Sequence, residues 1–291
     1  MKKKSLLAIC AVWVMLFSAT VGMADVIDPM DNISAPPGTF VLVSYFNQLH
    51  YPDITDNKGN ESDFGLDLSL LVLRPVYFIG KIADSLSYGV NAIIPVGHLS
   101  FDSGNVFGAP SVNEFGIGDI GISPFIYLYE NPDSQFYISL WEFVFMPTGD
   151  YSMNNAVNIG RDAWWFQHQI AMGWYPGKFG VDFNINYFQY TESDDLKYDE
   201  PDAFEFETVV HYGVTEKFRV GVNAAYWIGV DDAEIDGVTL PDSEPMSFKL
   251  GLNLTYVLSE NFIAGFRWMH DVDAENAPMG EWAYIKLAYV F

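Results

Sequence analysis

The stretch Val181-Asp182-Phe183-Asn184-Ile185-Asn186-Tyr187 alternates strictly between apolar and polar side chains. In an extended strand, successive side chains point to opposite faces, so a period of two is the signature of a β-strand with one apolar and one polar face. A helix would instead repeat its apolar residues every three or four positions. The stretch therefore predicts a strand that separates two different environments.

The same period returns along most of the chain. Segments of this kind lie near 39–51, 64–79, 86–97, 116–129, 135–146, 163–175, 180–191, 203–213, 218–230, 247–258, 262–270 and 281–291. The connections between them are alternately long and short, and short turns at one end with long loops at the other are typical of outer-membrane barrels. We therefore expect an all-β protein, a transmembrane antiparallel up-and-down β-barrel of about 12 strands.

The N-terminus has the pattern of an export signal. Three lysines follow Met1, an apolar run extends from Leu6 to Phe17, and small residues precede Asp25. We expect residues 1–24 to be a cleaved signal peptide, because the apolar run is short for the alternative, a membrane anchor. Residues 25–38 then form a periplasmic N-terminal segment, and residues 39–291 form the barrel. The single cysteine, Cys10, lies in the signal peptide, so no thiol chemistry is expected in the mature chain.

The charge of the chain excludes one class of partner. Without the three signal lysines, 11 basic residues stand against 38 acidic ones, a formal charge of -27. Such a chain repels nucleic acid, since phosphate contacts need clustered lysine and arginine. The acidic residues concentrate in the long connections, where they are either solvated charges or ligands for divalent cations shared with lipopolysaccharide.

Alternation alone does not say which face meets water, and a soluble lipocalin-like barrel or a sandwich also alternates. Two features favour lipid outside. The apolar faces are almost uncharged, and aromatic residues collect at the short-turn ends, as in a membrane-interface girdle. These aromatic residues are Tyr77, Tyr88, Tyr129, Trp174, Tyr212, Phe218, Tyr256, Phe262 and Tyr289. We expect the protein in the outer membrane of a Gram-negative bacterium, in contact with lipid and lipopolysaccharide.

The last residues alternate as well. Ile285, Leu287, Tyr289 and Phe291 share one face. A terminal aromatic residue on an alternating strand resembles the signal by which the barrel-assembly machinery recognises its substrates. We therefore assign Phe291 as the assembly signal.

The central third of the chain carries a more specific pattern. It comprises Gly116-Ile-Gly-Asp-Ile-Gly121 with Pro124, then Pro147-Thr-Gly-Asp-Tyr151, Asn158-Ile-Gly160 and Ala163-Trp-Trp-Phe166. In order and spacing these motifs resemble the family named for the meta-pathway of phenol degradation, whose members are SphA-like outer-membrane barrels. The resemblance extends over about residues 36–291. It implies a porin-like channel or transporter for small hydrophobic or aromatic compounds, and it supplies no agreed set of ligand residues.

We expect no enzyme, no metal site and no cofactor. The five histidines are scattered, without the short spacing of metal ligands. The chain has no Gly-x-Ser-x-Gly elbow for a catalytic serine. The glycine motif at 116–121 leads into a strand, whereas a dinucleotide-binding loop leads into a helix.

Inward-facing polar residues are the best candidates for function. We expect the lumen to be lined by Asp182, Asn184, Asn186, Glu205, Glu207, His211, Arg219, Asn223, Lys249, Asn253, Arg267 and Lys286. Simple hairpin register places His211 opposite Arg219, Glu207 opposite Asn223 and Asn253 opposite Arg267. Two interpretations follow: these residues line a path for passive uptake of a small solute, or they fill a structural or surface-interaction barrel with a plugged lumen.

The assembly signal gives the first testable prediction. Deletion of Phe291 should lower the amount of folded, heat-modifiable protein in the outer membrane while export continues, because the terminal aromatic residue is missing. The measurement is a heat-modifiability gel on membrane fractions at native expression. Normal insertion of the deletion variant would contradict the assignment.

Overall fold

A computed structural model describes residues 27–83, 85–102 and 110–291, so the expected signal peptide lies outside the described residues. Among the described residues there is no helix long and apolar enough to cross a membrane. The strands are β1 Phe40–Thr55, β2 Glu61–Ile82, β3 Leu86–Phe101, β4 Val112–Ile117, β5 Gly121–Asn131, β6 Phe136–Phe145, β7 Trp165–Trp174, β8 Phe179–Tyr190, β9 Tyr198–Asp199, β10 Ala203–Gly213, β11 Phe218–Gly229, β12 Glu234–Ile235, β13 Val238–Thr239, β14 Met246–Ser259, β15 Phe262–Glu275 and β16 Pro278–Val290.

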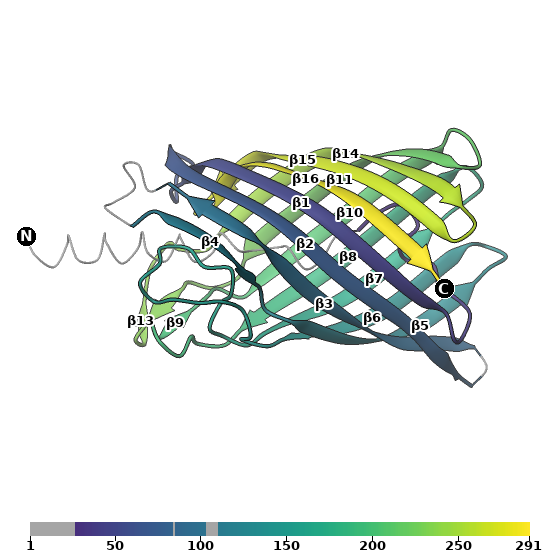
Figure 1. Cartoon of the computed structure of the whole chain (residues 1–291), viewed down its shortest axis with the longest axis horizontal. Helices are drawn as coiled ribbons and strands as arrows, with labels where there is room; N and C mark the ends of the chain where they lie inside the picture. Colours follow the sequence, from purple (N-terminus) through teal and green to yellow (C-terminus); the bar gives the residue numbers. More distant parts are fainter. Residues whose placement is uncertain (1–26, 84, 103–109) are drawn as a thin grey trace, which may run out of the picture.

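The strands close into a barrel (Figure 1). Antiparallel pairing runs in the order β2-β1-β16-β15-β14-β11-β10-β8-β7-β6-β5-β3-β4, and β2 also pairs with β3. Strands β4 and β5 occupy one position in the wall, because both pair with β3, β4 along residues 96–101 and β5 along residues 88–93. The wall therefore has twelve positions, and the expected up-and-down barrel is confirmed. Strands β9, β12 and β13 form a small separate sheet among the long loops.

The two ends of the barrel differ as the sequence predicted. Short turns join β2 to β3, β5 to β6, β7 to β8, β10 to β11 and β14 to β15 at one end, and the C-terminus lies at this same end (Figure 1). The longer connections, with β9, β12 and β13, lie at the opposite end. We call these the short-turn end and the long-loop end.

Strand β8 shows how the alternation divides the wall. Asp182, Asn184 and Asn186 are buried in the lumen, at most 2% exposed, whereas Phe183 and Ile185 are half-buried on the outside. Strand β2 is reversed: its leucines Leu66 and Leu68 point inward and Asp67 points outward. The lumen beside β2 is filled by a hydrophobic core, so this strand turns its apolar face to the inside.

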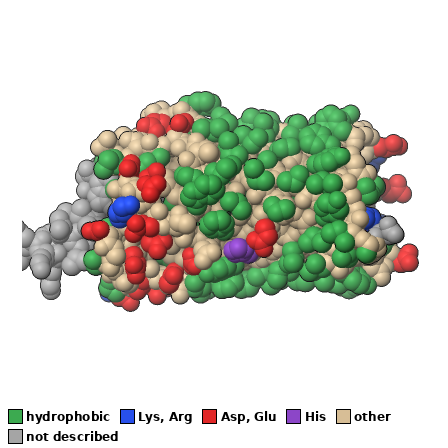
Figure 2. Space-filling view, turned by 90° about the horizontal axis from the view of Figure 1, so that it is seen from below, with side chains coloured by type: hydrophobic (Ala, Val, Ile, Leu, Met, Phe, Trp, Pro, Cys, Tyr) green, Lys and Arg blue, Asp and Glu red, His purple; other side chains and the backbone are tan. Residues whose placement is uncertain are grey.

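The outer surface is largely apolar. Figure 2 shows hydrophobic side chains over the wall and most acidic side chains of this face gathered at the long-loop end. At the short-turn end, six of the aromatic residues predicted to form a girdle are exposed, between 37% and 51%: Tyr77, Tyr129, Trp174, Tyr212, Tyr256 and Tyr289. This pattern is that of a wall facing lipid, with aromatic rings at the interface.

Histidines interrupt the apolar surface in pairs with acids or amides. His50 Nδ1 lies 2.8 Å from Asp67 Oδ1, and His168 Nδ1 lies 2.6 Å from Glu142 Oε2. His98 Nε2 lies 2.9 Å from Asn113 Oδ1. Polar groups on an apolar surface need such partners, so the outward histidines belong to the wall and not to the lumen.

The orientation of β8 gives a second prediction. Phe183→Arg, which puts a charge on the lipid-facing side, should lower the free energy of unfolding by about 2–4 kcal/mol if residue 183 lies near the bilayer midplane. Phe183→Leu, an apolar control at the same position, should change it much less. Both are measured by denaturant titration in lipid vesicles. Spin labels that find residue 183 in water and residue 184 in lipid would overturn the assignment.

Candidate functional site

All twelve residues predicted to line the lumen point into it. Asp182, Asn184, Asn186, Glu205, Glu207, His211, Asn223, Asn253, Arg267 and Lys286 are buried, and Arg219 and Lys249 are partly buried. Their neighbours in each strand face outward, because side chains alternate along a strand. The lumen is therefore polar on β8, β10, β11 and β14–β16, and apolar on β2.

One of the three expected strand pairings is confirmed. Asn253 lies opposite Arg267. The other two are wrong by two residues, since His211 lies opposite Gly221 and Asn223 opposite Val209. The β10–β11 hairpin closes with the pair Gly213 and Arg219, so its turn is longer than simple register assumed. A shift of two keeps every side chain on its face, which is why these residues still face the lumen.

The N-terminal segment, residues 27–35, occupies the lumen near the short-turn end. The sequence analysis assigned residues 25–38 to the periplasmic side, and the described residues 27–35 of that stretch lie against inward-facing side chains of the wall. Lys286 Nζ lies 3.0 Å from Asp28 Oδ2 and donates to Asp31 Oδ1 at 2.6 Å. Asp28 Oδ1 also accepts from Asn253 Nδ2 at 2.6 Å and from the Tyr284 hydroxyl at 2.7 Å. One lysine from the last strand thus binds two carboxylates of the segment.

The segment has a second attachment on β8. The backbone N–H of Met30 donates to Asp182 Oδ2 at 2.9 Å, and Asn32 Nδ2 donates to Asn184 Oδ1 at 3.3 Å. The Tyr175 hydroxyl also donates to Asp182. Further along, Ser34 Oγ donates to Glu130 Oε2 at 2.6 Å. Residues far apart in the chain therefore hold the segment at three points around the lumen.

Other charges in the lumen are paired with one another. Lys249 Nζ lies 2.8 Å from Asp271 Oδ1, and Arg267 Nη2 lies 3.6 Å from Glu207 Oε1. Arg219 Nη1 donates to His211 Nδ1 at 3.2 Å. Buried charges need partners of this kind, because an unpaired charge in the interior is costly. Lys249 and Arg267 are therefore paired with acidic neighbours, and Arg219 is hydrogen-bonded to a histidine.

The glycine motifs fix the loops at the long-loop end. Asp119 Oδ1 accepts from the Gly149 N–H at 3.0 Å and its Oδ2 from the Arg161 N–H at 3.1 Å. A Cβ on Gly149 would lie 2.5 Å from the Gly160 Cα, so this crossing of two loops requires glycine. Burial raises the pKa of Asp119. The motifs thus have a structural role that the sequence alone did not show.

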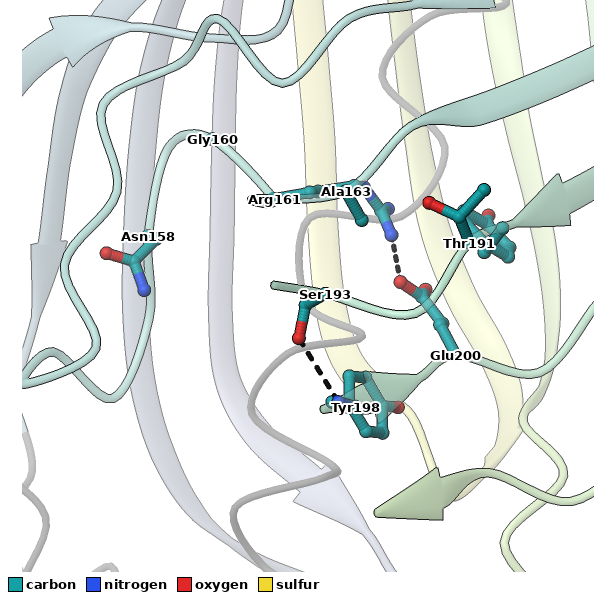
Figure 3. A pocket seen from close by; sticks show the side chains of 9 residues that line it. Asn158, Gly160, Arg161, Ala163, Thr191, Ser193, Tyr198 and Glu200 are labelled. Carbon is teal, nitrogen blue, oxygen red and sulfur yellow. Dashed lines mark hydrogen bonds and ion pairs between the residues drawn. The ribbon is translucent and has the colours of Figure 1, made fainter. Parts of the chain in front are cut away.

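A buried ion pair completes this arrangement of loops (Figure 3). The Arg161 guanidinium contacts the Glu200 carboxylate and lies over the rings of Trp165 and Tyr190, 5.3 and 4.9 Å from their centroids. Burial raises the pKa of Glu200 to about 7, against the lowering effect of Arg161. Nearby, Ala156 and Val157 of the same loop are fully buried in the core. The 146–164 loop therefore packs into the hydrophobic core.

A cavity of about 430 Å³ remains beside the N-terminal segment. Its wall includes Tyr45, Arg74, Phe78, Tyr127, Trp141 and Gln169, and the segment covers it with Met30 and Ile33. Sequence reasoning missed Arg74, although a signal was present: it is the only charged residue among the even-numbered positions 64–78. Those positions form the inward face of β2, and a single arginine on an otherwise apolar face indicates a specific role.

Solved structures of other proteins share this architecture. None of the curated proteins matches the chain in sequence. The crystal structure of the COG4313 outer membrane channel from Pseudomonas putida F1 is similar with a TM-score of 0.82 and 19% identity, covering 91% of this chain and 100% of that one. The beta domain of the Bordetella autotransporter BrkA follows with a TM-score of 0.52 and 8% identity, over 88% of this chain and 100% of that one. At these identities the likeness establishes the fold.

The family is shown by the sequence itself. The model of the family described as the MetA-pathway of phenol degradation matches residues 50–287. This range runs from the middle of β1 nearly to the end of β16 and includes the motifs that fix the loops. The chain therefore belongs to the family described as the MetA-pathway of phenol degradation.

Proposed function

We propose that this barrel is a passive outer-membrane channel for small solutes of hydrophobic or aromatic character, and that the N-terminal segment is its gate. The observation that carries this proposal is the way the segment is held. Besides the apolar packing of Ile27, Met30 and Ile33, the segment contacts the wall through ion pairs and hydrogen bonds of Asp28, Asp31 and Asn32. Water replaces contacts of this kind readily, whereas it does not replace a dry apolar core. Displacement of the segment would join the cavity to the rest of the lumen.

The channel activity named for the Pseudomonas protein is the activity we propose for this chain. The twelve lumen residues then line the path, and Arg219 lies where the path meets the short-turn end, since it borders the cavity together with Lys217. The alternative is a structural or surface-interaction barrel whose lumen stays plugged. The pairing of Lys249 with Asp271 and of Arg267 with Glu207 favours that alternative, so the two need a direct test.

The surroundings form part of the proposal. The apolar wall contacts outer-membrane lipid, and the acidic loops face lipopolysaccharide at the cell surface. The barrel-assembly machinery recognises Phe291, whose side chain is 66% exposed and lies next to the Phe40 ring, with centroids 5.3 Å apart. An exposed aromatic side chain directly after the last strand is accessible to such a partner.

A disulfide lock tests the gate. The mature chain has no cysteine of its own, so Asn32→Cys with Asn184→Cys introduces one defined pair where the two side chains already touch. The oxidised double variant should lose conductance in planar bilayers and solute uptake in liposomes, and a reducing agent should restore both. The single variant Asn32→Cys, which cannot form the bond, is the control. Absence of conductance and of solute uptake in the wild type would contradict the channel proposal and favour the barrel with a plugged lumen.

A further inference from the structure

The wall of the cavity beside the N-terminal segment is mostly apolar. Its apolar side chains come from the segment and from several strands, β1 and β2 among them, and include Met30, Ile33, Val41, Val43, Val76 and Phe78. Contact with water is unfavourable for such side chains, and a ligand with an apolar body removes their surface from water. The volume, about 430 Å³, lies within the roughly 300–1,000 Å³ of small-molecule sites.

The charged side chains that border the cavity inside the wall already have partners. Lys286 Nζ lies 2.6 Å from Asp31 Oδ1, and Arg219 Nη1 donates to His211 Nδ1. Arg74 is engaged as well, with its guanidinium against two rings of β6. The two other charged side chains are exposed in the turn between β10 and β11: Glu216 and Lys217. A charged ligand would lose its hydration without gaining a free counter-charge, which is costly, so the cavity favours a neutral molecule.

Two polar groups border the cavity without a hydrogen-bond partner among the described residues. They are the Tyr127 hydroxyl and Gln169 Oε1, which belong to residues that are 1% and 5% exposed. Buried polar groups are almost always satisfied, and each exception needs an explanation. A phenolic hydroxyl can donate, and an amide oxygen can only accept. A bound group that accepts from the first and donates to the second satisfies both.

The strand register places these two groups on either side of one residue. Gln169 of β7 lies directly opposite Trp141 of β6, and Trp141 lies opposite Phe125 of β5. Tyr127 is the next inward residue of β5 after Phe125, since side chains alternate along a strand. Trp141 also borders the cavity. Opposite and diagonal neighbours in a sheet are within reach of one another, so one small molecule at this point of the wall can contact both groups.

We propose that the cavity is a binding site for a neutral alcohol with an apolar body. The alcohol hydroxyl accepts from the Tyr127 hydroxyl and donates to Gln169 Oε1, while the body lies against the apolar side chains of β1, β2 and the segment. A hydroxyl is the simplest group that fits, because it is a donor and an acceptor at once. This inference names the class of solute for the proposed channel, and its biological role rests on that proposed function.

Equilibrium dialysis of the whole mature protein tests the site, with benzyl alcohol as the probe and the same detergent on both sides. Toluene, which lacks the hydroxyl, and benzoate, which carries a charge, are the comparison ligands. Benzyl alcohol should bind at least about tenfold more tightly than benzoate, because the carboxylate loses its hydration without a free cation to replace it. Equal or tighter binding of benzoate would overturn the proposal, as would a wild type that does not bind benzyl alcohol.

Variants assign the contacts of the hydroxyl. Tyr127→Phe removes a single oxygen atom and Gln169→Leu removes the amide, and each should weaken binding of benzyl alcohol about two- to tenfold, the effect of one hydrogen bond. Neither should weaken binding of toluene, which cannot make these bonds. Tyr137→Phe makes the same change on the adjacent strand β6, at a residue that is not part of the cavity wall. This matched control should leave the binding of both ligands unchanged.

Two results with the variants would contradict the site. Unchanged binding of benzyl alcohol in both Tyr127→Phe and Gln169→Leu would mean that the two groups do not hold the hydroxyl. Equal weakening of benzyl alcohol and toluene would mean that the variants change the packing of the cavity and not a hydrogen bond to the ligand.

The binding assay separates this inference from the channel itself. If benzyl alcohol does not bind while the liposomes still take up solute, the inference is wrong and the channel stands. If benzyl alcohol binds but neither conductance nor uptake occurs, the site is real and the channel proposal is wrong.

Discussion

The closure of the sheet between β2 and β3 is the constraint from which the rest of the structure follows. In lipid, every backbone N–H and C=O must find a partner within the protein, and only a closed barrel leaves no strand edge unpaired. Closure encloses an interior that must then be filled. On β2 leucines and on β5–β7 aromatic rings fill it, and on the opposite side polar residues do. Those polar residues need partners that the wall alone does not supply.

The N-terminal segment supplies many of them. Lys286 lies in the last strand, and its charge is balanced by Asp28 and Asp31, which the segment carries into the lumen. A buried ammonium without such partners is strongly unfavourable, so the segment and the wall stabilise each other. The same contacts are polar and surround a cavity, which makes them suited to a closure that can be reversed. In the proposed channel, stability and gating would depend on the same few ion pairs.

The sequence predicted the features that depend on the local alternation of side chains. The inward face of Asp182, Asn184 and Asn186 and the pairing of Asn253 with Arg267 follow from alternation and a tight turn. The predicted β10–β11 register was wrong because the alternation of side chains does not determine the length of the turn. The position of residues 27–35 was not predictable, since these residues have no period and Asp28 contacts Tyr284, 256 residues away. The inward orientation of the apolar face of β2 was not predictable either, because alternation does not show which face of a strand is apolar inside and which contacts the surroundings.

Single-channel recording of Lys286→Met tests the central claim, that ion pairs of Lys286 hold the segment in the lumen, most directly. Without the ammonium, Asp28 and Asp31 lose their shared cation, so the account predicts more frequent opening than in the wild type. Lys249→Met removes another lumen cation, which pairs with Asp271 and not with the segment, and should not increase opening in the same way. Equal opening of wild type and Lys286→Met, with both proteins fully folded, would contradict the account.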